Sequence, residues 1–247
     1  MRIVFLFGLI VLLGGSVLLG WHYHPKIAFK PNFAAINSLN TRQQVFIKFM
    51  VPKIYLANQE ILAVRNHIID LALELQQGQI LSYADQMWLK ETAYIYQLPN
   101  FNYHNPLNVV ALLERVDVVP ASLVLAQAGN ESAWGASRFA VYADNFFGQY
   151  CYVAGCGIVP KRRPDGAIYE LQKFKNVQDA INEYLYNLNT SSSYAEFRKA
   201  RALMRKQHQP LMGFELAQGL INYSILGRQY ISIIQSIIIS HGLMQFD

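Results

Sequence analysis

The hydropathy pattern begins with an uncharged apolar run at residues 3–21, preceded by Arg2. A helix needs about 20 mostly apolar residues to span a bilayer, and this run is close to that length. A cleavable signal peptide is the alternative, although its apolar region is normally shorter and ends at a small-residue cleavage site. We expect residues 1–21 to form a transmembrane anchor or a signal segment, and residues 22–40 to form a linker.

Beyond the linker, apolar residues recur at the spacing of amphipathic helices. Thr41 can cap a first helix, Pro52 starts or kinks a second, and Ser82 with Asp85 resembles a capping box. Because these helices carry no cluster of catalytic residue types, we interpret residues 41–118 as a helical accessory region. The predicted helices cover residues 41–51, 52–77, 83–96 and 106–115.

The periodicity changes in the second half of the chain. Residues 148–176 are rich in turn and β-forming residues, and an Asp165-Gly166 turn predicts a small β-hairpin there. Helices are predicted on both sides of the hairpin, over residues 120–131, 137–142, 177–188, 195–206, 212–223 and 229–241. The fold class is therefore mainly α (α+β), with residues 119–247 as a second domain.

Composition narrows the function only slightly. The chain has 247 residues, 53% of them hydrophobic and 15% charged, with a net charge of +5. A positive charge favours an anionic polymer or a membrane surface as partner. No nucleic-acid-binding motif is present, and the pattern does not indicate an oligomeric state.

The chain has two cysteines, Cys151 and Cys156, with four residues between them. Outside the cytoplasm such a pair is expected to form a disulfide, with two unpaired thiols as the alternative. A zinc site would need four ligands, and no further His or Cys stands at ligand spacing. We predict no metal and no cofactor.

Glu131 is the strongest candidate for chemistry. It stands at the end of an apolar helix that begins after Pro120. The negative end of the helix dipole and the apolar neighbours both favour the protonated carboxylic acid. Cleavage of a glycosidic bond requires such an acid, because the leaving oxygen must be protonated.

The residues around Glu131 carry a resemblance to a known family. The stretch Ala-Gln-Ala-Gly-Asn-Glu-Ser-Ala-Trp-Gly at residues 126–135, followed by Asn145-Phe146-Phe147-Gly148, resembles the catalytic segment of flagellar-muramidase-type peptidoglycan β-N-acetylglucosaminidases. It is most similar to the Bax protein family, through Gly155-Cys156-Gly157, Asn187-Leu188-Asn189-Thr190 and Tyr223-Ser224 with Gly227 and Tyr230. The resemblance implies a lysozyme-like two-lobed helical domain with a small β-hairpin lobe, and a glucosaminidase-like catalytic domain at residues 119–247.

The resemblance also implies a set of site residues. Glu131 would be the general acid, Glu170 the second acid in the hairpin lobe, and Tyr194 a tyrosine of the cleft. Glu170 has an alternative role as a partner of Lys161 or Arg162, and an acetamido group of the substrate is an alternative nucleophile. The candidates for substrate binding are Trp134, Asn145, Phe147, Gly148 and Tyr150. For Trp134 we favour a place in the core wall, and for Asn145 and Gly148 a role in holding the turn that a glycan approaches.

We therefore expect a glycoside hydrolase that cleaves peptidoglycan after N-acetylglucosamine. It would be anchored in a bacterial inner membrane and face the periplasm, or be secreted there after signal cleavage. Peptidoglycan glycan strands are the expected partner. A lytic transglycosylase and a non-catalytic wall-binding scaffold are the alternatives.

The anchor hypothesis predicts that the protein fractionates with membranes and retains Met1, because residues 3–21 are near spanning length. N-terminal sequencing of the membrane fraction checks this. A mature N-terminus beyond Trp21 would show instead that the segment is a cleaved signal.

Overall fold

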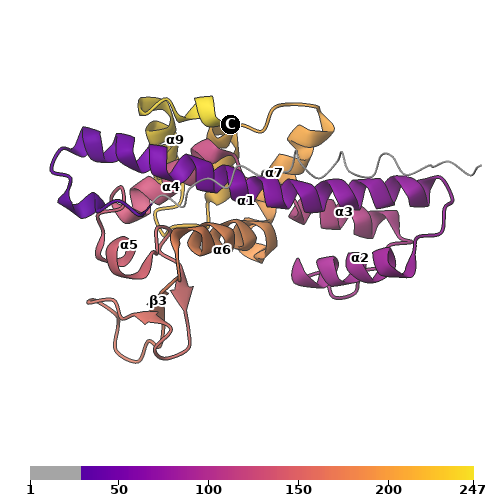
Figure 1. Cartoon of the computed structure of the whole chain (residues 1–247), viewed down its shortest axis with the longest axis horizontal. Helices are drawn as coiled ribbons and strands as arrows, with labels where there is room; N and C mark the ends of the chain where they lie inside the picture. Colours follow the sequence, from indigo (N-terminus) through magenta and orange to yellow (C-terminus); the bar gives the residue numbers. More distant parts are fainter. Residues whose placement is uncertain (1–28) are drawn as a thin grey trace, which may run out of the picture. The chain divides into compact units, whose positions relative to one another are not determined.

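The computed structural model describes residues 29–247 (Figure 1). Pro31–Asp247 form one compact unit of helices with a single small sheet, which confirms the mainly α (α+β) prediction. No helix within residues 29–247 is both long enough and apolar enough to cross a membrane. The expected anchor at residues 1–21 lies outside the described residues.

The longest element is helix α1, Leu39–Gln76, which was expected as two helices. Ser38 caps it by accepting a hydrogen bond from the Thr41 amide at 3.3 Å. Pro52 lies inside the helix and removes one backbone hydrogen bond. The helix continues because Met50 and Ile54, two residues before and after Pro52, are completely buried. The start of a new helix at Pro52 was therefore wrong, and a kink there stays a prediction.

Helix α1 takes part in two hydrophobic clusters. Its first half packs with α4, Ala121–Ser132, and α6, Val177–Thr190, in the larger core. Its second half packs with α2, Tyr83–Ile95, and α3, Pro106–Arg115, in the smaller one. Both short helices match the predicted bounds, and Figure 1 shows them beside the far half of α1. The domain boundary between residues 118 and 119 stays a prediction.

Part of the expected linker is ordered. Phe33 lies in a 3-10 turn, η1, Phe33–Ala35, and is buried against Phe46 and Phe49 of α1. The bounds of the linker, residues 22–40, stay a prediction. The apolar burial of one phenylalanine fixes the entry into α1.

Of the remaining helices, α8, Gly213–Leu216, α9, Arg228–Ser240, and the 3-10 turn η4, Leu243–Phe246, pack against α4. The predicted helix over residues 212–223 is instead a short α8 followed by the 3-10 turn η3. Gly219 lies within this 3-10 turn, where glycine weakens an α-helix and where its backbone touches Phe197 too closely for a side chain. The elements are α5, Arg138–Ala143; η2, Ser192–Tyr194; α7, Ala195–Lys206; α8, Gly213–Leu216; η3, Ala217–Leu220; α9, Arg228–Ser240; and η4, Leu243–Phe246.

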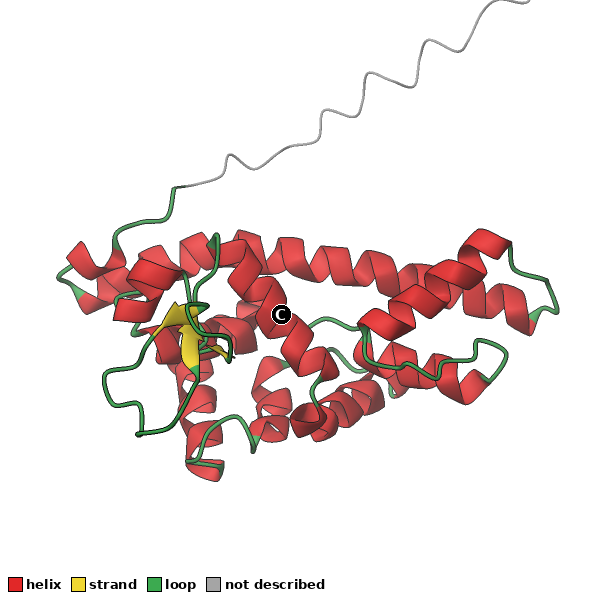
Figure 2. Ribbon diagram, turned by 90° about the horizontal axis from the view of Figure 1, so that it is seen from below, coloured by secondary structure: helices red, strands yellow, loops and turns green. Residues whose placement is uncertain are grey.

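The sheet has three short strands, β1, Tyr150–Cys151, β2, Gly157–Ile158, and β3, Glu170–Gln172, in the order β1-β3-β2. Both pairings are antiparallel, and Figure 2 shows the strands in yellow. We call residues 148–174 the β-lobe. The predicted hairpin exists, with its turn closed from the Ala167 amide to the Pro164 carbonyl at 3.1 Å. Its strands are shorter than expected because Pro160 and Pro164 cannot donate to a ladder.

A buried charge cluster holds the connection from α3 to α4. The carboxylate of Asp117, 2% exposed, accepts two hydrogen bonds from Arg205 at 2.8 and 3.0 Å. Arg65 and Arg201 lie within 3.5 and 3.9 Å of it. Burial alone would raise the pKa of Asp117, but the Arg205 hydrogen bond and the three positive charges outweigh burial and lower it.

Two of these arginines also donate hydrogen bonds to backbone carbonyl oxygens of this connection. Arg201 donates to the carbonyls of Asp117, Val118 and Glu114 at 2.9–3.0 Å. Arg65 donates to those of Leu113 and Val116. Carbonyl groups at the end of α3 thus receive hydrogen bonds from side chains of α1 and α7. These hydrogen bonds fix where α4 begins.

The start of α4 is capped by a distant residue. Pro120 has no side chain that can accept a hydrogen bond. The Asp247 carboxylate accepts from the Ser122 amide at 2.9 Å and the Ser122 hydroxyl at 2.7 Å. It also accepts from the Gly213 amide at 2.9 Å, so one carboxylate serves the first turns of α4 and α8.

Asp117→Asn should destabilise the protein by about 3–5 kcal/mol at pH 7, because it leaves buried arginines without their counter-charge. Since the folded-state pKa of Asp117 is lowered, its stabilisation is present above the unfolded value, about 3.9, and is lost as pH falls through the folded value. Urea unfolding of the wild type and the variant at pH 7 and pH 3 measures the loss of stability and its dependence on pH. The exposed Asp165→Asn is the control, and an equal deficit at both pH values would contradict the charge argument.

Candidate active site

Glu131 lies in the last turn of α4 and is partly exposed. The helix ends in an unusual turn, because Ala133, Trp134 and Gly135 all have positive φ, at 51°, 56° and 82°. Such conformations cost about 1 kcal/mol or more for a residue with a side chain. The Ser132 hydroxyl stabilises the turn by accepting from the Gly135 amide at 2.8 Å.

One oxygen of Glu131 is held by two donors. The Tyr230 hydroxyl donates to Oε1 at 2.8 Å, and the Asn130 side-chain amide donates to the same oxygen at 3.1 Å. The other oxygen, Oε2, is directed toward Gly148, where an added Cβ would lie 3.9 Å away. The carboxyl group therefore lies between α9 and the start of the β-lobe.

Tyr230 belongs to a buried chain of hydrogen bonds. Gln127, on α4 four residues before Glu131, donates its amide to the Tyr230 oxygen at 3.0 Å. Tyr184 of α6 donates its hydroxyl to Gln127 Oε1. Burial, followed by the Glu131 charge, raises the pKa of Tyr230 far above its usual value, so this residue stays a neutral phenol.

Aromatic rings form a wall beside this chain. Tyr230 stacks on Tyr223 at 5.3 Å between ring centroids, and Phe147 stacks on Tyr184 at 4.1 Å. The Tyr223 hydroxyl donates to the Phe147 carbonyl at 3.0 Å. Tyr194, also near Tyr223 at 6.0 Å, completes the wall, and burial raises its pKa. The structure thus brings two predicted site residues, Phe147 and Tyr194, into one cluster with Tyr230.

Asn145, Gly148 and Tyr150 lie where α5 passes into the β-lobe. The Asn145 amide donates to the Gln149 and Gln172 carbonyls at 2.8 and 3.0 Å, and its oxygen accepts from the Gln149 amide at 3.0 Å. Asn145 is thus fully occupied in holding the β-lobe. Tyr150 is 54% exposed, and burial, neighbouring tyrosines and the Glu131 charge raise its pKa.

Trp134 lies in the core instead of in the aromatic wall. It is 8% exposed and packs against Phe46 at 5.5 Å and His241 at 4.7 Å. Its ring covers Gly129, where an added Cβ would meet it at 2.9 Å. This is the core position that the sequence favours for Trp134.

Glu170 binds the disulfide loop. Its two oxygens accept from the amides of Gly155 and Gly157 at 3.0 and 2.8 Å. These two backbone hydrogen bonds lower its pKa and outweigh its burial, so the group is ionised. The Cys151–Cys156 disulfide closes the same loop. The partners of Glu170 are thus backbone amides, where Lys161 or Arg162 had been considered.

Gln127 and Tyr184 were not predicted as site residues, and Tyr223 and Tyr230 entered only through the family resemblance. One feature of the sequence points to Gln127 as a site residue. It is a polar residue within an apolar helix, four positions before Glu131, and so shares its helix face. Tyr184 gave none, because one tyrosine on an amphipathic helix is ordinary packing material.

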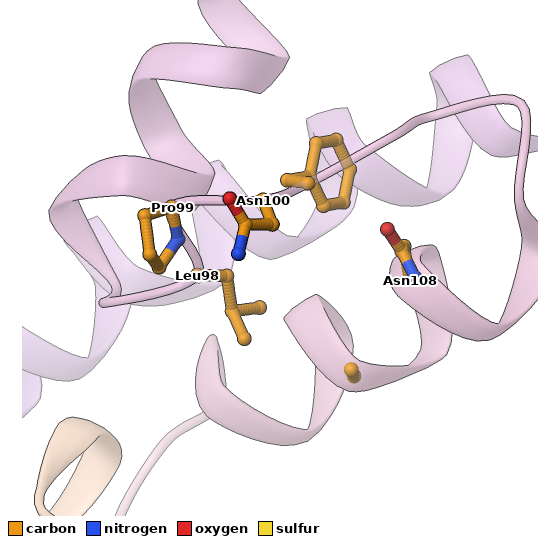
Figure 3. Close-up of a pocket in the computed structure, with 6 residues that line it drawn as sticks. Leu98, Pro99, Asn100 and Asn108 are labelled. Atoms are coloured by element: carbon orange, nitrogen blue, oxygen red, sulfur yellow. The ribbon is translucent and has the colours of Figure 1, made fainter.

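A cavity of about 230 Å³ lies in the accessory region, near the turn between α2 and α3 (Figure 3). Its lining contains no titratable group, so it offers no acid or base for catalysis. It is formed by Leu98, Pro99, Asn100, Phe101, Asn108 and Ala111. Among residues 29–247, no group of three or more His, Cys, Asp or Glu side chains is arranged to hold a metal ion.

Comparison with known proteins identifies the class first. The family described as mannosyl-glycoprotein endo-β-N-acetylglucosaminidase, or glucosaminidase, matches residues 107–242, more than half of the chain. The chain therefore belongs to the glucosaminidase family, which supports a peptidoglycan-related glycosidase role. Among curated proteins it is similar to Protein bax of Escherichia coli K12, with 32% identity over 205 residues, 83% of this chain and 72% of that protein. No solved structure matches.

The disulfide should be present in the native protein, so thiol labelling without reductant should detect no free cysteine. Cys151→Ser with Cys156→Ser should lower stability by only about 2 kcal/mol, because the closed loop is short. Loss should concentrate in the β-lobe, which hydrogen exchange can localise. Labelling of both cysteines in the folded, non-reduced protein would contradict this.

Proposed function

We propose that this protein is a peptidoglycan hydrolase that cleaves the glycosidic bond after N-acetylglucosamine, with Glu131 as general acid. The observation that carries the proposal is the placement of this carboxyl group. It is partly exposed at the end of α4, one oxygen is held by two donors, and the other is directed toward Gly148. Family membership supplies the glycan class.

Glu131 acts by giving its proton to the leaving glycosidic oxygen while the C1–O bond breaks. The resulting carboxylate then accepts a proton from the water that attacks C1, which restores the acid. The absence of a side chain at Gly148 leaves room for the sugar next to Oε2. Tyr150, exposed and near the Glu131 charge, offers a ring face for a sugar.

Glu170 does not fit the role of second catalytic acid. Both oxygens are engaged by the Gly155 and Gly157 amides, and freeing them would release the disulfide loop. We propose that Glu170 positions the β-lobe. The 2-acetamido group of the substrate then supplies the nucleophile: its carbonyl oxygen attacks C1 as the leaving group departs, and water later opens the cyclic intermediate.

The same proposal places the enzyme at the periplasmic face of a bacterial inner membrane, where its polymer lies. The intact disulfide supports an oxidising compartment. Exposed Lys161 and Arg162 in the β-lobe favour an anionic polymer.

Glu131→Gln should lower the rate of glycan cleavage about 10²–10⁴-fold, because the amide keeps the shape but cannot deliver a proton. Release of reduced muropeptides from purified peptidoglycan, followed by mass spectrometry, measures the rate. Products that contain one added water indicate hydrolysis, and anhydro sugars would indicate a lytic transglycosylase instead.

Glu183→Gln is the matched control, since Glu183 is an exposed glutamate on α6. It should cleave at the wild-type rate. Wild-type-like release by Glu131→Gln would refute the mechanism, and no release by any version, wild type included, would favour a wall-binding scaffold.

A further inference from the structure

We infer that Tyr230 is a positioning residue that fixes which oxygen of Glu131 carries the catalytic proton. The inference rests on the proposed function of Glu131 and concerns residues behind it. The buried chain Tyr184–Gln127–Tyr230 ends on Oε1 of Glu131. All three side chains are almost completely buried, so their polar atoms hydrogen-bond to one another and not to solvent water.

The direction of the chain is set by the orientation of the Gln127 side-chain amide. Tyr184 donates its hydroxyl hydrogen to Gln127 Oε1, so the Gln127 amide nitrogen is directed at Tyr230. The Tyr230 oxygen then accepts from Gln127, and its own hydrogen is available only for Glu131. Since burial keeps Tyr230 protonated, that hydrogen is always present.

The consequence concerns the two oxygens of Glu131. Oε1 already accepts from Tyr230 and from Asn130, so a third hydrogen there would meet the Tyr230 hydrogen. The acid proton is therefore confined to Oε2, the oxygen directed toward Gly148 and the open side of the site. The chain holds the acid in the orientation needed for transfer, and the leaving oxygen must approach from the Gly148 side.

The reverse direction makes a different prediction. If the Gln127 amide were turned over, Tyr230 would donate to Gln127, and Glu131 would have to donate from Oε1 to Tyr230. The proton would then point into the protein, away from the substrate. The two directions stabilise opposite protonation states of Glu131, so removal of the Tyr230 hydroxyl moves the pH dependence in opposite directions.

The test is Tyr230→Phe in the full chain, assayed for muropeptide release from peptidoglycan across pH. The ring and its stacking on Tyr223 remain, and only the hydroxyl is lost. We expect kcat to fall about 10- to 100-fold, with KM little changed because Tyr230 is buried behind the acid. The alkaline limb of the pH profile should move up by about one unit, because a donor to the carboxylate is gone.

Tyr186→Phe is the matched control, since this tyrosine of α6 donates to the Ile95 carbonyl at 2.9 Å and has no link to Glu131. It should leave the rate and the pH profile unchanged. If Tyr230→Phe does not fold, 3-fluorotyrosine at position 230 keeps the shape and strengthens the donor. The alkaline limb should then move to lower pH.

Each outcome decides the inference. An unchanged rate and profile in Tyr230→Phe, while Glu131→Gln is inactive, would overturn the role of Tyr230 and leave the proposed function intact. A shift of the alkaline limb to lower pH would show the reverse direction and also overturn it. A loss of rate without any shift would reduce Tyr230 to a packing residue. If the wild type itself releases nothing, both proposals fail.

Discussion

The fold depends on the buried carboxylate of Asp117 and the arginines around it. These side chains come from α1 and α7, and they join the end of α3 to the start of α4. Arg201 and Arg65 also donate to backbone carbonyls of the same connection. An ion cluster of this kind adds little net stability compared with an apolar core, but it permits few alternative arrangements. Its effect here is to fix the position of α4, which carries Glu131.

The far end of α4 is fixed by a different kind of interaction. There the buried chain from Gln127 and the aromatic wall hold Glu131, while the left-handed turn at Ala133 and Trp134 ends the helix abruptly. The strained turn is tolerated because Trp134 is locked into the core. Asn145 then positions the β-lobe against this rigid group. The partly exposed acid is therefore held from behind by buried residues, Tyr230 and Gln127 among them.

Local signals predicted much of the fold. The capping signal at Ser82 predicted the bounds of α2 to within a residue, because capping chemistry is contained in a few neighbouring positions. Packing over long distances was not visible. The continuation of α1 through Pro52 depends on the burial of residues around it. The hydrogen bonds to the Glu170 carboxylate come from backbone amides that reach it only after the disulfide loop has closed. The acid at Glu131 was found from its helix, but its partner Tyr230 lies 99 residues away and no spacing rule connects them.

The cap of α4 has a consequence for the order of events during biosynthesis. The Ser122 amide and hydroxyl bind a carboxylate that lies 125 residues later in the chain. Until that segment has been synthesised and has returned to α4, the helix begins at Pro120 without a capping side chain. Closing so long a loop is slow and adds little stability before neighbouring contacts form. Helix α4 therefore gains its N-terminal cap only after the segment that carries Asp247 has folded back onto it.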